Sequence, residues 1–162
     1  MMQYSDIIFG DQNEWEIASG VPHIPFEALD ENYVIDREAY LSYFRKMHRL
    51  FPKCKKMVMA VRNQIASSHH TLSGLLYDTV EDQLYTTRIY DIQPIVDPMG
   101  VGDAFIAAYI HAHQKWGDEN QYCLDFSLSA SAIKNTIPGD QNLVSEEEII
   151  SNMTSSGGRI QR

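Results

Sequence analysis

The feature that most constrains the fold of this chain is the stretch Asp97–Tyr109, Asp-Pro-Met-Gly-Val-Gly-Asp-Ala-Phe-Ile-Ala-Ala-Tyr. Gly100 and Gly102 flank a single residue, and glycine adopts backbone angles closed to other residues and lets a ligand approach the main chain. The apolar run that follows predicts a helix from Asp103 to about Trp116. The stretch therefore predicts a glycine turn that leads directly into a helix.

The start of this helix allows two interpretations. Free N–H groups at a helix N-terminus, together with the macrodipole, form a site for an anion, and phosphate is a common occupant. Asp103 at such a site would have a chemical task, such as accepting a proton from an attacking hydroxyl. In the alternative interpretation, the glycines form an ordinary turn and Asp103 only caps the helix.

The rest of the chain alternates between predicted strands and predicted helices. Periodicity and capping residues predict strands at 5–10, 56–61, 72–77 and 83–90 and helices at 11–20, 36–51, 103–116, 120–135 and from 145 onward. This alternation predicts an α/β fold with a mainly parallel sheet flanked by helices. Ligands bind such sheets beyond the carboxyl ends of the strands, where the Asp97 loop is expected. We expect residues 1–155 to form one domain and residues 156–162 a flexible tail.

Composition restricts the kinds of partner. The net charge of −9 over 162 residues argues against a nucleic-acid partner, because phosphate backbones are held by clustered Lys and Arg. No segment approaches the roughly 20 apolar residues that span a bilayer, so we expect no membrane partner. Cys54 and Cys123 lie far apart without metal-ligand spacing, and they indicate reduced thiols in a cytoplasmic protein.

Three further patterns have a structural explanation beside a functional one. His69 and His70 could bind a metal, but no further ligand is near in sequence, and a polar loop is the preferred interpretation. Asp11 and Glu14 fit the caps of a helix start. The predicted helix at 120–135 is rich in small residues, which either allow close packing or leave room for a flat ligand. These small residues are Ser127, Ser129, Ala130, Ser131 and Ala132.

Several of these segments resemble the ribokinase-like (PfkB) sugar kinases. The run Asp97–Phe105 is similar to the family signature D-x-x-G-A-G-D-x-F, and Ile7–Glu14 is similar to a family pattern of the magnesium and nucleotide region, I-I-F-x-N-x-x-E. Within the family, the chain looks most like the 2-keto-3-deoxygluconate kinases. The stretches that support this are Ala66–His70, Lys134–Asp140 with Asn142 and Leu143, and Gly158–Arg162.

The resemblance implies ATP-dependent phosphorylation of 2-keto-3-deoxygluconate, a small sugar acid, with Mg²⁺ as a cofactor. Asp103 would be the general base, and the amides of Gly100, Val101 and Gly102 would form the anion hole for the transferred phosphoryl group. Glu14 would help to hold hydrated Mg²⁺. The residues implied to contact the nucleotide are Asp11, Ser127, Ala130 and Ser131.

The chain also departs from the family pattern. Val101 replaces the usual alanine but leaves its amide available, and Asp11 replaces an asparagine and brings negative charge towards the phosphates. Leu128 stands where relatives carry an asparagine near the adenine. Arg62–Gln64 replaces a glycine-containing loop, so the nucleotide contacts of that loop are not carried over.

The N-terminal half of the family fold, with most sugar-binding residues, is not among these residues. We therefore expect the chain to be the C-terminal half of a kinase domain, with little or no kinase activity alone. A sheet cut through its middle exposes a strand edge, which predicts homo-oligomers or other association through that edge. Two alternatives stay open: a kinase for another sugar, such as fructose or ribose, and a catalytically silent nucleotide-binding or interaction module.

Overall fold

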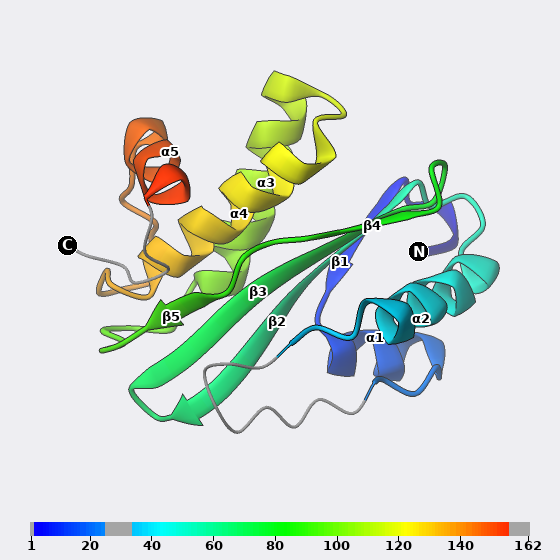
Figure 1. Cartoon of the computed structure of the whole chain (residues 1–162), viewed down its shortest axis with the longest axis horizontal. Coiled ribbons are helices and arrows are strands. Elements are labelled where there is room, and N and C mark those ends of the chain that lie inside the picture. The colour runs from blue at the N-terminus through cyan, green and yellow to red at the C-terminus, as the bar shows by residue number, and fades with distance from the viewer. Residues whose placement is uncertain (1, 25–33, 156–162) are drawn as a thin grey trace.

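The computed structural model describes residues 2–24 and 34–155, which form one sheet with helices on both faces (Figure 1). The expected α/β class is confirmed, whereas the tail expected at 156–162 lies outside the described residues. No helix in the described ranges has the length and apolar character needed to cross a membrane. In chain order the elements are η1 Met2–Tyr4, β1 Ile7–Gly10, α1 Gln12–Ser19, α2 Arg37–Leu50, β2 Lys56–Ala66, β3 His69–Asp78, β4 Gln83–Thr86, β5 Tyr90–Ile92, α3 Val101–Trp116, α4 Asn120–Lys134 and α5 Glu146–Thr154.

The described sheet is mixed, so the expectation of a mainly parallel sheet was wrong. The strand order is β1-β2-β3-β4, and β5 also pairs with β3. Only β1 and β2 run parallel, while β3 pairs antiparallel with β2, β4 and β5. The reason is the length of the connections: two residues join β2 to β3 and four join β3 to β4, and such short turns permit only antiparallel neighbours.

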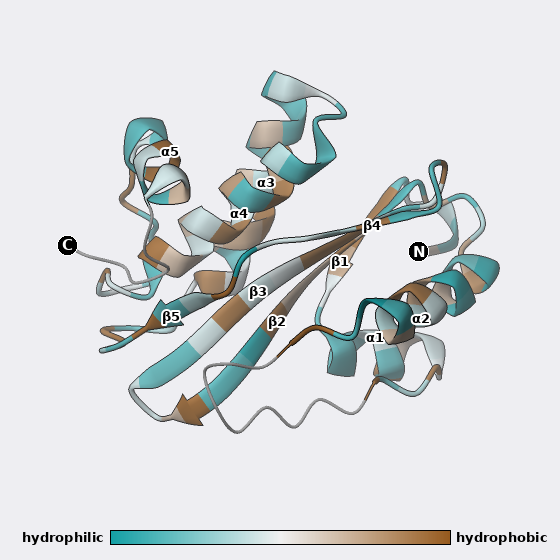
Figure 2. Ribbon diagram, viewed as in Figure 1, coloured by the Kyte–Doolittle hydropathy of each residue, from teal (hydrophilic) through white to brown (hydrophobic). Residues whose placement is uncertain are grey.

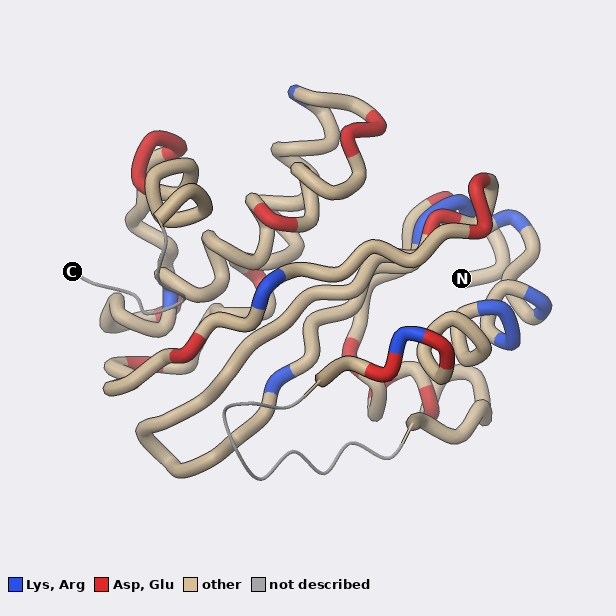
Figure 3. The backbone as a smooth tube through the Cα atoms, viewed as in Figure 1, with Lys and Arg blue, Asp and Glu red and all other residues tan. Residues whose placement is uncertain are grey.

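Helices cover the two faces of the sheet in separate groups (Figure 1). Along β2, Val58 packs into a core with α3, α4 and α5, whereas Met57 and Met59 pack into a second core with α1 and α2. This alternation explains the continuous apolar run at 57–61 of β2, because a strand that is buried on both faces needs apolar side chains at every position. Apolar residues follow the strands between the helix layers (Figure 2), and charged residues lie mainly on helices and loops (Figure 3).

The strands expected at 56–61 and 72–77 are longer in the structure and form a hairpin, which corrects the interpretation of the adjacent histidines. His69 and His70 lie at the start of β3 and pair with the end of β2 instead of forming a polar loop. His70 is buried, and His69 Nε2 lies 2.5 Å from Asp91 Oδ1. No group of three or more His, Cys, Asp and Glu side chains that could hold a metal ion occurs among the described residues.

A buried lysine joins the sheet to the start of α4. Lys56 Nζ donates to Asp118 Oδ1 at 2.7 Å and to Asn120 Oδ1 at 2.5 Å, and it lies 3.7 Å from Asp78 Oδ2. The side chains of Lys56 and Asp78 are 7% and 8% exposed. The neighbouring Lys55 instead pairs with Asp6 at the surface, where both side chains are more than half exposed.

The two adjacent lysines give a matched stability test. Lys56→Met leaves the buried Asp78 without its cation, so we expect the free energy of unfolding to fall by about 3 kcal/mol. Lys55→Met removes only an exposed ion pair and should change that free energy by less than about 1 kcal/mol. Denaturant unfolding measures both values, and equal effects of the two substitutions would contradict the structural role of Lys56.

Candidate functional site

The candidate site is a cleft of about 360 Å³ between the end of β1 and the start of α3. It lies where the single parallel strand pair meets the glycine turn, as expected for a ligand site at strand ends. Both α1 and α3 begin at this cleft. Its lining residues are Phe9, Gly10, Asp11, Glu14, Ala60, Arg62, Leu72, Pro98, Val101, Gly102, Asp103, Phe105, Ile106 and Ser131.

The start of α3 presents unsatisfied amides to this cleft. Gly100 is the N-cap, and it provides no side-chain cap for the helix. The first backbone bond at this end runs from the Ala104 amide to the Gly100 carbonyl at 2.9 Å. The amides of Val101, Gly102 and Asp103 therefore lack helical acceptors, which gives this end partial positive charge.

Gly100 and Gly102 differ in why glycine occupies each position. Gly100 has φ = 75°, and a Cβ there would overlap the carbonyl oxygen of Asp140. At Gly102 a Cβ would meet no atom within 4 Å, so the fold itself does not require glycine at this position. Because Gly102 lines the cleft, its missing side chain keeps space open in front of the amides.

Asp103 faces the cleft with its carboxylate free. The side chain is exposed, and it makes no hydrogen bond or ion pair within residues 2–24 and 34–155. It does not cap α3, so the alternative interpretation as a capping residue does not describe its position. A carboxylate without a partner, next to free amides, is available to accept a proton.

The glycine turn is held in place by Asp97. Its Oδ1 accepts from the Met99 amide at 2.9 Å, and its Oδ2 accepts from the Gly139 amide at 2.8 Å. These two amides, with a smaller effect of the nearby Lys134, lower the pKa of Asp97. The amides of Val96 and Asp97 both donate to the Asn135 carbonyl. The turn is thus fixed to the end of α4 and to the bend that follows it.

Asp11 and Glu14 lie at the opposite side of the cleft and form the expected capping box. The Asp11 amide donates to Glu14 Oε2 at 2.9 Å, and the Glu14 amide donates to Asp11 Oδ1 at 2.8 Å. Each carboxylate keeps a second oxygen that is not used by the cap. These oxygens suit a hydrated Mg²⁺, which usually combines one or two carboxylates with water and phosphate oxygens.

The three small residues expected near the adenine are not equivalent. Ser131 lines the cleft, and its hydroxyl donates to the Val101 carbonyl at 3.0 Å. Ser127 and Ala130 are fully buried outside the cleft lining, and the Ser127 hydroxyl donates to the Phe105 carbonyl. At these two positions small size serves the close packing of α4 on α3. Leu128 is also buried in that core.

Arg62 is the charged lining residue that the sequence did not identify as functional. It was noted only as a departure from a glycine loop, whereas the structure places it in the cleft. The period of two along β2 carries the missing signal, because Val58, Ala60 and Arg62 occupy alternate positions and so share one face of the sheet.

Solved structures with a similar fold are kinases. A 2-dehydro-3-deoxygluconokinase of Thermotoga maritima is 28% identical with a TM-score of 0.80, and the match covers 95% of this chain and 43% of that chain. A PfkB-family carbohydrate kinase of Listeria grayi is 25% identical with a TM-score of 0.74, covering 95% and 42%. The fold is that of the PfkB carbohydrate kinases.

More distant structures agree on the fold alone. A ribokinase of Thermotoga maritima is 17% identical with a TM-score of 0.53, covering 93% of this chain and 42% of that chain. No family model matches the chain, and no curated protein matches its sequence. The chain spans less than half the length of these PfkB-fold kinases, which fits the expected C-terminal part of the domain.

The two glycines of the turn provide the test of this geometry. Gly100→Ala should lower the free energy of unfolding by about 1–3 kcal/mol, because alanine is strained at positive φ and would meet the Asp140 carbonyl. Gly102→Ala is sterically free and should leave that energy unchanged or raise it by up to about 1 kcal/mol. Denaturant unfolding measures the free energy of unfolding of both variants. If Gly100→Ala leaves that free energy unchanged, the turn is not held as described.

Proposed function

We propose that this chain carries the phosphoryl-transfer site of a cytoplasmic, ATP-dependent sugar kinase that acts on 2-keto-3-deoxygluconate. The observation that carries the proposal is the unpaired carboxylate of Asp103, which shares one cleft with the free amides at the start of α3. The choice of sugar acid is supported by the 28% identity with a 2-dehydro-3-deoxygluconokinase. Both cysteines are free thiols, as suits a reducing compartment.

In the proposed reaction, a hydroxyl oxygen of the sugar acid attacks the γ-phosphorus of ATP. Asp103 accepts the hydroxyl proton, the bond from the γ-phosphorus to the bridging oxygen breaks, and ADP leaves. General-base assistance of this kind contributes about 10²–10⁴ in rate. The exposed position of Asp103 allows the hydroxyl to reach it.

The glycine turn would stabilise the transferred group. Negative charge on the equatorial oxygens of the phosphoryl group would meet the amides of Gly100, Val101 and Gly102 at the positive end of α3. One comparable donor contributes about 10²–10³ in rate. Asp97 serves this step indirectly, because it holds the turn in position before the nucleotide binds.

Glu14 would hold Mg²⁺ through water, and Asp11 and Ser131 would lie beside the nucleotide. Bound Mg²⁺ would neutralise part of the negative charge on the phosphate oxygens of the nucleotide. Ser127 and Ala130 support this arrangement only through the packing of α4 on α3.

The base assignment predicts a selective loss of turnover. In a chimera in which this chain replaces the matched 43% of the Thermotoga maritima kinase, Asp103→Asn should lower kcat at least about 100-fold. Because asparagine keeps the size of aspartate, nucleotide affinity should stay within about twofold. Asp36→Asn is the matched control, since asparagine is an equally good N-cap for α2.

The same assay separates the alternatives. ADP formation by an active Asp103→Asn chimera would contradict the base assignment. Faster phosphorylation of fructose or ribose than of the sugar acid would favour another sugar kinase. Nucleotide binding without transfer would favour a silent nucleotide-binding module, an alternative that the extra carboxylate of Asp11 in the cleft supports.

A second partner is proposed at the edge of the sheet. Within the described ranges β1 pairs only with β2, so the other side of β1 presents unpaired backbone groups. Association there, with the remainder of a kinase domain or with a second copy, would satisfy these groups.

This edge predicts that the isolated chain associates with itself. Sedimentation velocity should show a mean mass that rises with concentration above the 18.5 kDa of one chain. If the chain stays monomeric at high concentration, the proposal that another chain binds the β1 edge would be contradicted.

A further inference from the structure

Arg62 is a cation in the cleft that has no partner within the described part of the chain. It lies on β2 opposite Leu72 of β3, and both residues line the cleft. Its side chain is exposed and makes no hydrogen bond or ion pair with residues 2–24 or 34–155. The guanidinium is therefore available to a ligand.

Arg62 is also the sole basic side chain among the described lining residues. The lining contains three carboxylates, those of Asp11, Glu14 and Asp103. Burial, followed by electrostatic effects of Arg62 and His69, lowers the pKa of the nearby His70, so His70 adds no second cation at neutral pH. Without Arg62, the cleft would oppose any anionic ligand by three negative charges.

The chemistry of the guanidinium selects the kind of ligand. A planar guanidinium donates through a rigid fork that matches the oxygens of phosphate, and hydrogen bonds between charged groups are the strong ones. The free amides of α3 favour the same ligand, because helix N-termini bind phosphate. Arg62 belongs to β2 and the free amides belong to α3, so the cation and the amides are independent contributions to phosphate binding.

We propose that Arg62 binds the polyphosphate chain of the nucleotide and offsets the carboxylate that Asp11 brings into the cleft. The inference rests on the proposed function, since it names a phosphate contact in that same site. Arg62 would thus set the preference of the cleft for a nucleoside polyphosphate over a nucleoside.

Calorimetric titration of the chain with tripolyphosphate, Mg²⁺–AMP-PNP and adenosine tests this assignment. Arg62→Gln should weaken binding of the two phosphate ligands by about tenfold or more at low salt, because a charged hydrogen bond is lost. Adenosine affinity should stay within about twofold. Thermal unfolding of each variant verifies that the fold is retained.

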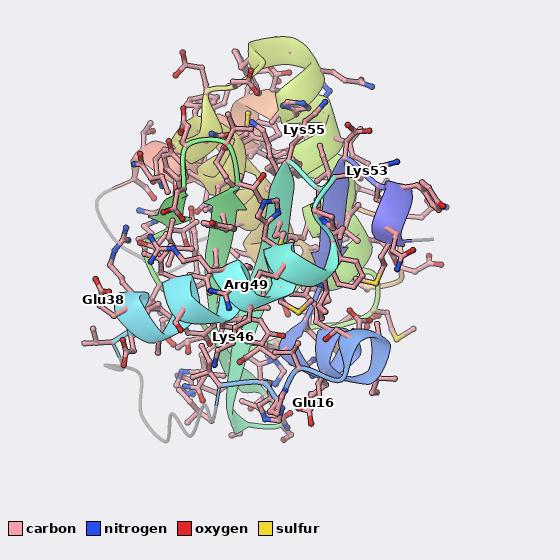
Figure 4. All side chains as sticks on the ribbon, turned by 90° about the vertical axis from the view of Figure 1, so that its right-hand side faces the viewer. Glu16, Glu38, Lys46, Arg49, Lys53 and Lys55 are labelled. Carbon is pink, nitrogen blue, oxygen red and sulfur yellow. The ribbon has the colours of Figure 1, made fainter. Side chains whose placement is uncertain are left out.

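Two variants complete the design. Arg49→Gln removes the same charge from the exposed surface of α2, on the other face of the sheet (Figure 4), and should leave all affinities within about twofold. Asp11→Asn keeps the N-cap of α1 and removes one repelling charge, so it should strengthen binding of both phosphate ligands several-fold.

The outcomes separate this inference from the proposed function. Unchanged AMP-PNP affinity in Arg62→Gln would overturn the inference and leave the proposed function standing. Arg62-dependent binding of tripolyphosphate without binding of AMP-PNP would support the inference and count against the kinase. Equal losses for adenosine and the phosphate ligands would place Arg62 away from the phosphates, and a native chain that binds none of the ligands would contradict both proposals.

Discussion

The candidate site depends on the two hydrogen bonds that the Asp97 carboxylate accepts from the amides of Met99 and Gly139. They join the glycine turn to the segment after α4, and Gly100 allows this close approach because it carries no Cβ beside the Asp140 carbonyl. The orientation of α3, and with it the direction of its free amides, follows from this junction. Hydrogen bonds from these two amides lower the pKa of Asp97, because they favour the ionised carboxylate that accepts them.

The cleft combines a helix N-terminus that has free amides with the carboxylates of Asp11, Glu14 and Asp103. Asp11 and Glu14 have a structural reason to be there, since each caps the other's amide at the start of α1. Asp103 caps no amide, and its place in the first turn of α3 gives it only the weak stabilisation of a carboxylate near a helix N-terminus. That contrast separates two residues that cap a helix from one that does not, and an unpaired acid beside free amides suits the proton transfer that we propose.

Local signals in the sequence predicted most helices, the capping boxes and the glycine turn, because caps and stops act within a few residues. They did not predict the mixed sheet, because strands were expected at 56–61 and 72–77 with residues 62–71 between them. In the structure β2 and β3 extend to a two-residue turn, which permits only antiparallel pairing. Ser127 and Ala130 could not be assigned from composition, because small residues serve helix packing and ligand pockets equally. Arg62 was missed because the period of two along β2 groups it with Val58 and Ala60, whereas which face of the strand lies towards α3 is a tertiary property.

The central claim is that the free amides of α3 receive the phosphates of a nucleotide beside Asp103. A crystal structure of the chain with Mg²⁺–AMP-PNP tests it most directly. We predict oxygens of the terminal phosphate within hydrogen-bonding distance of the turn amides, about 2.7–3.2 Å, with the Asp103 carboxylate facing the γ-phosphorus. A nucleotide bound elsewhere, or bound with its phosphates pointing away from α3, would contradict the account.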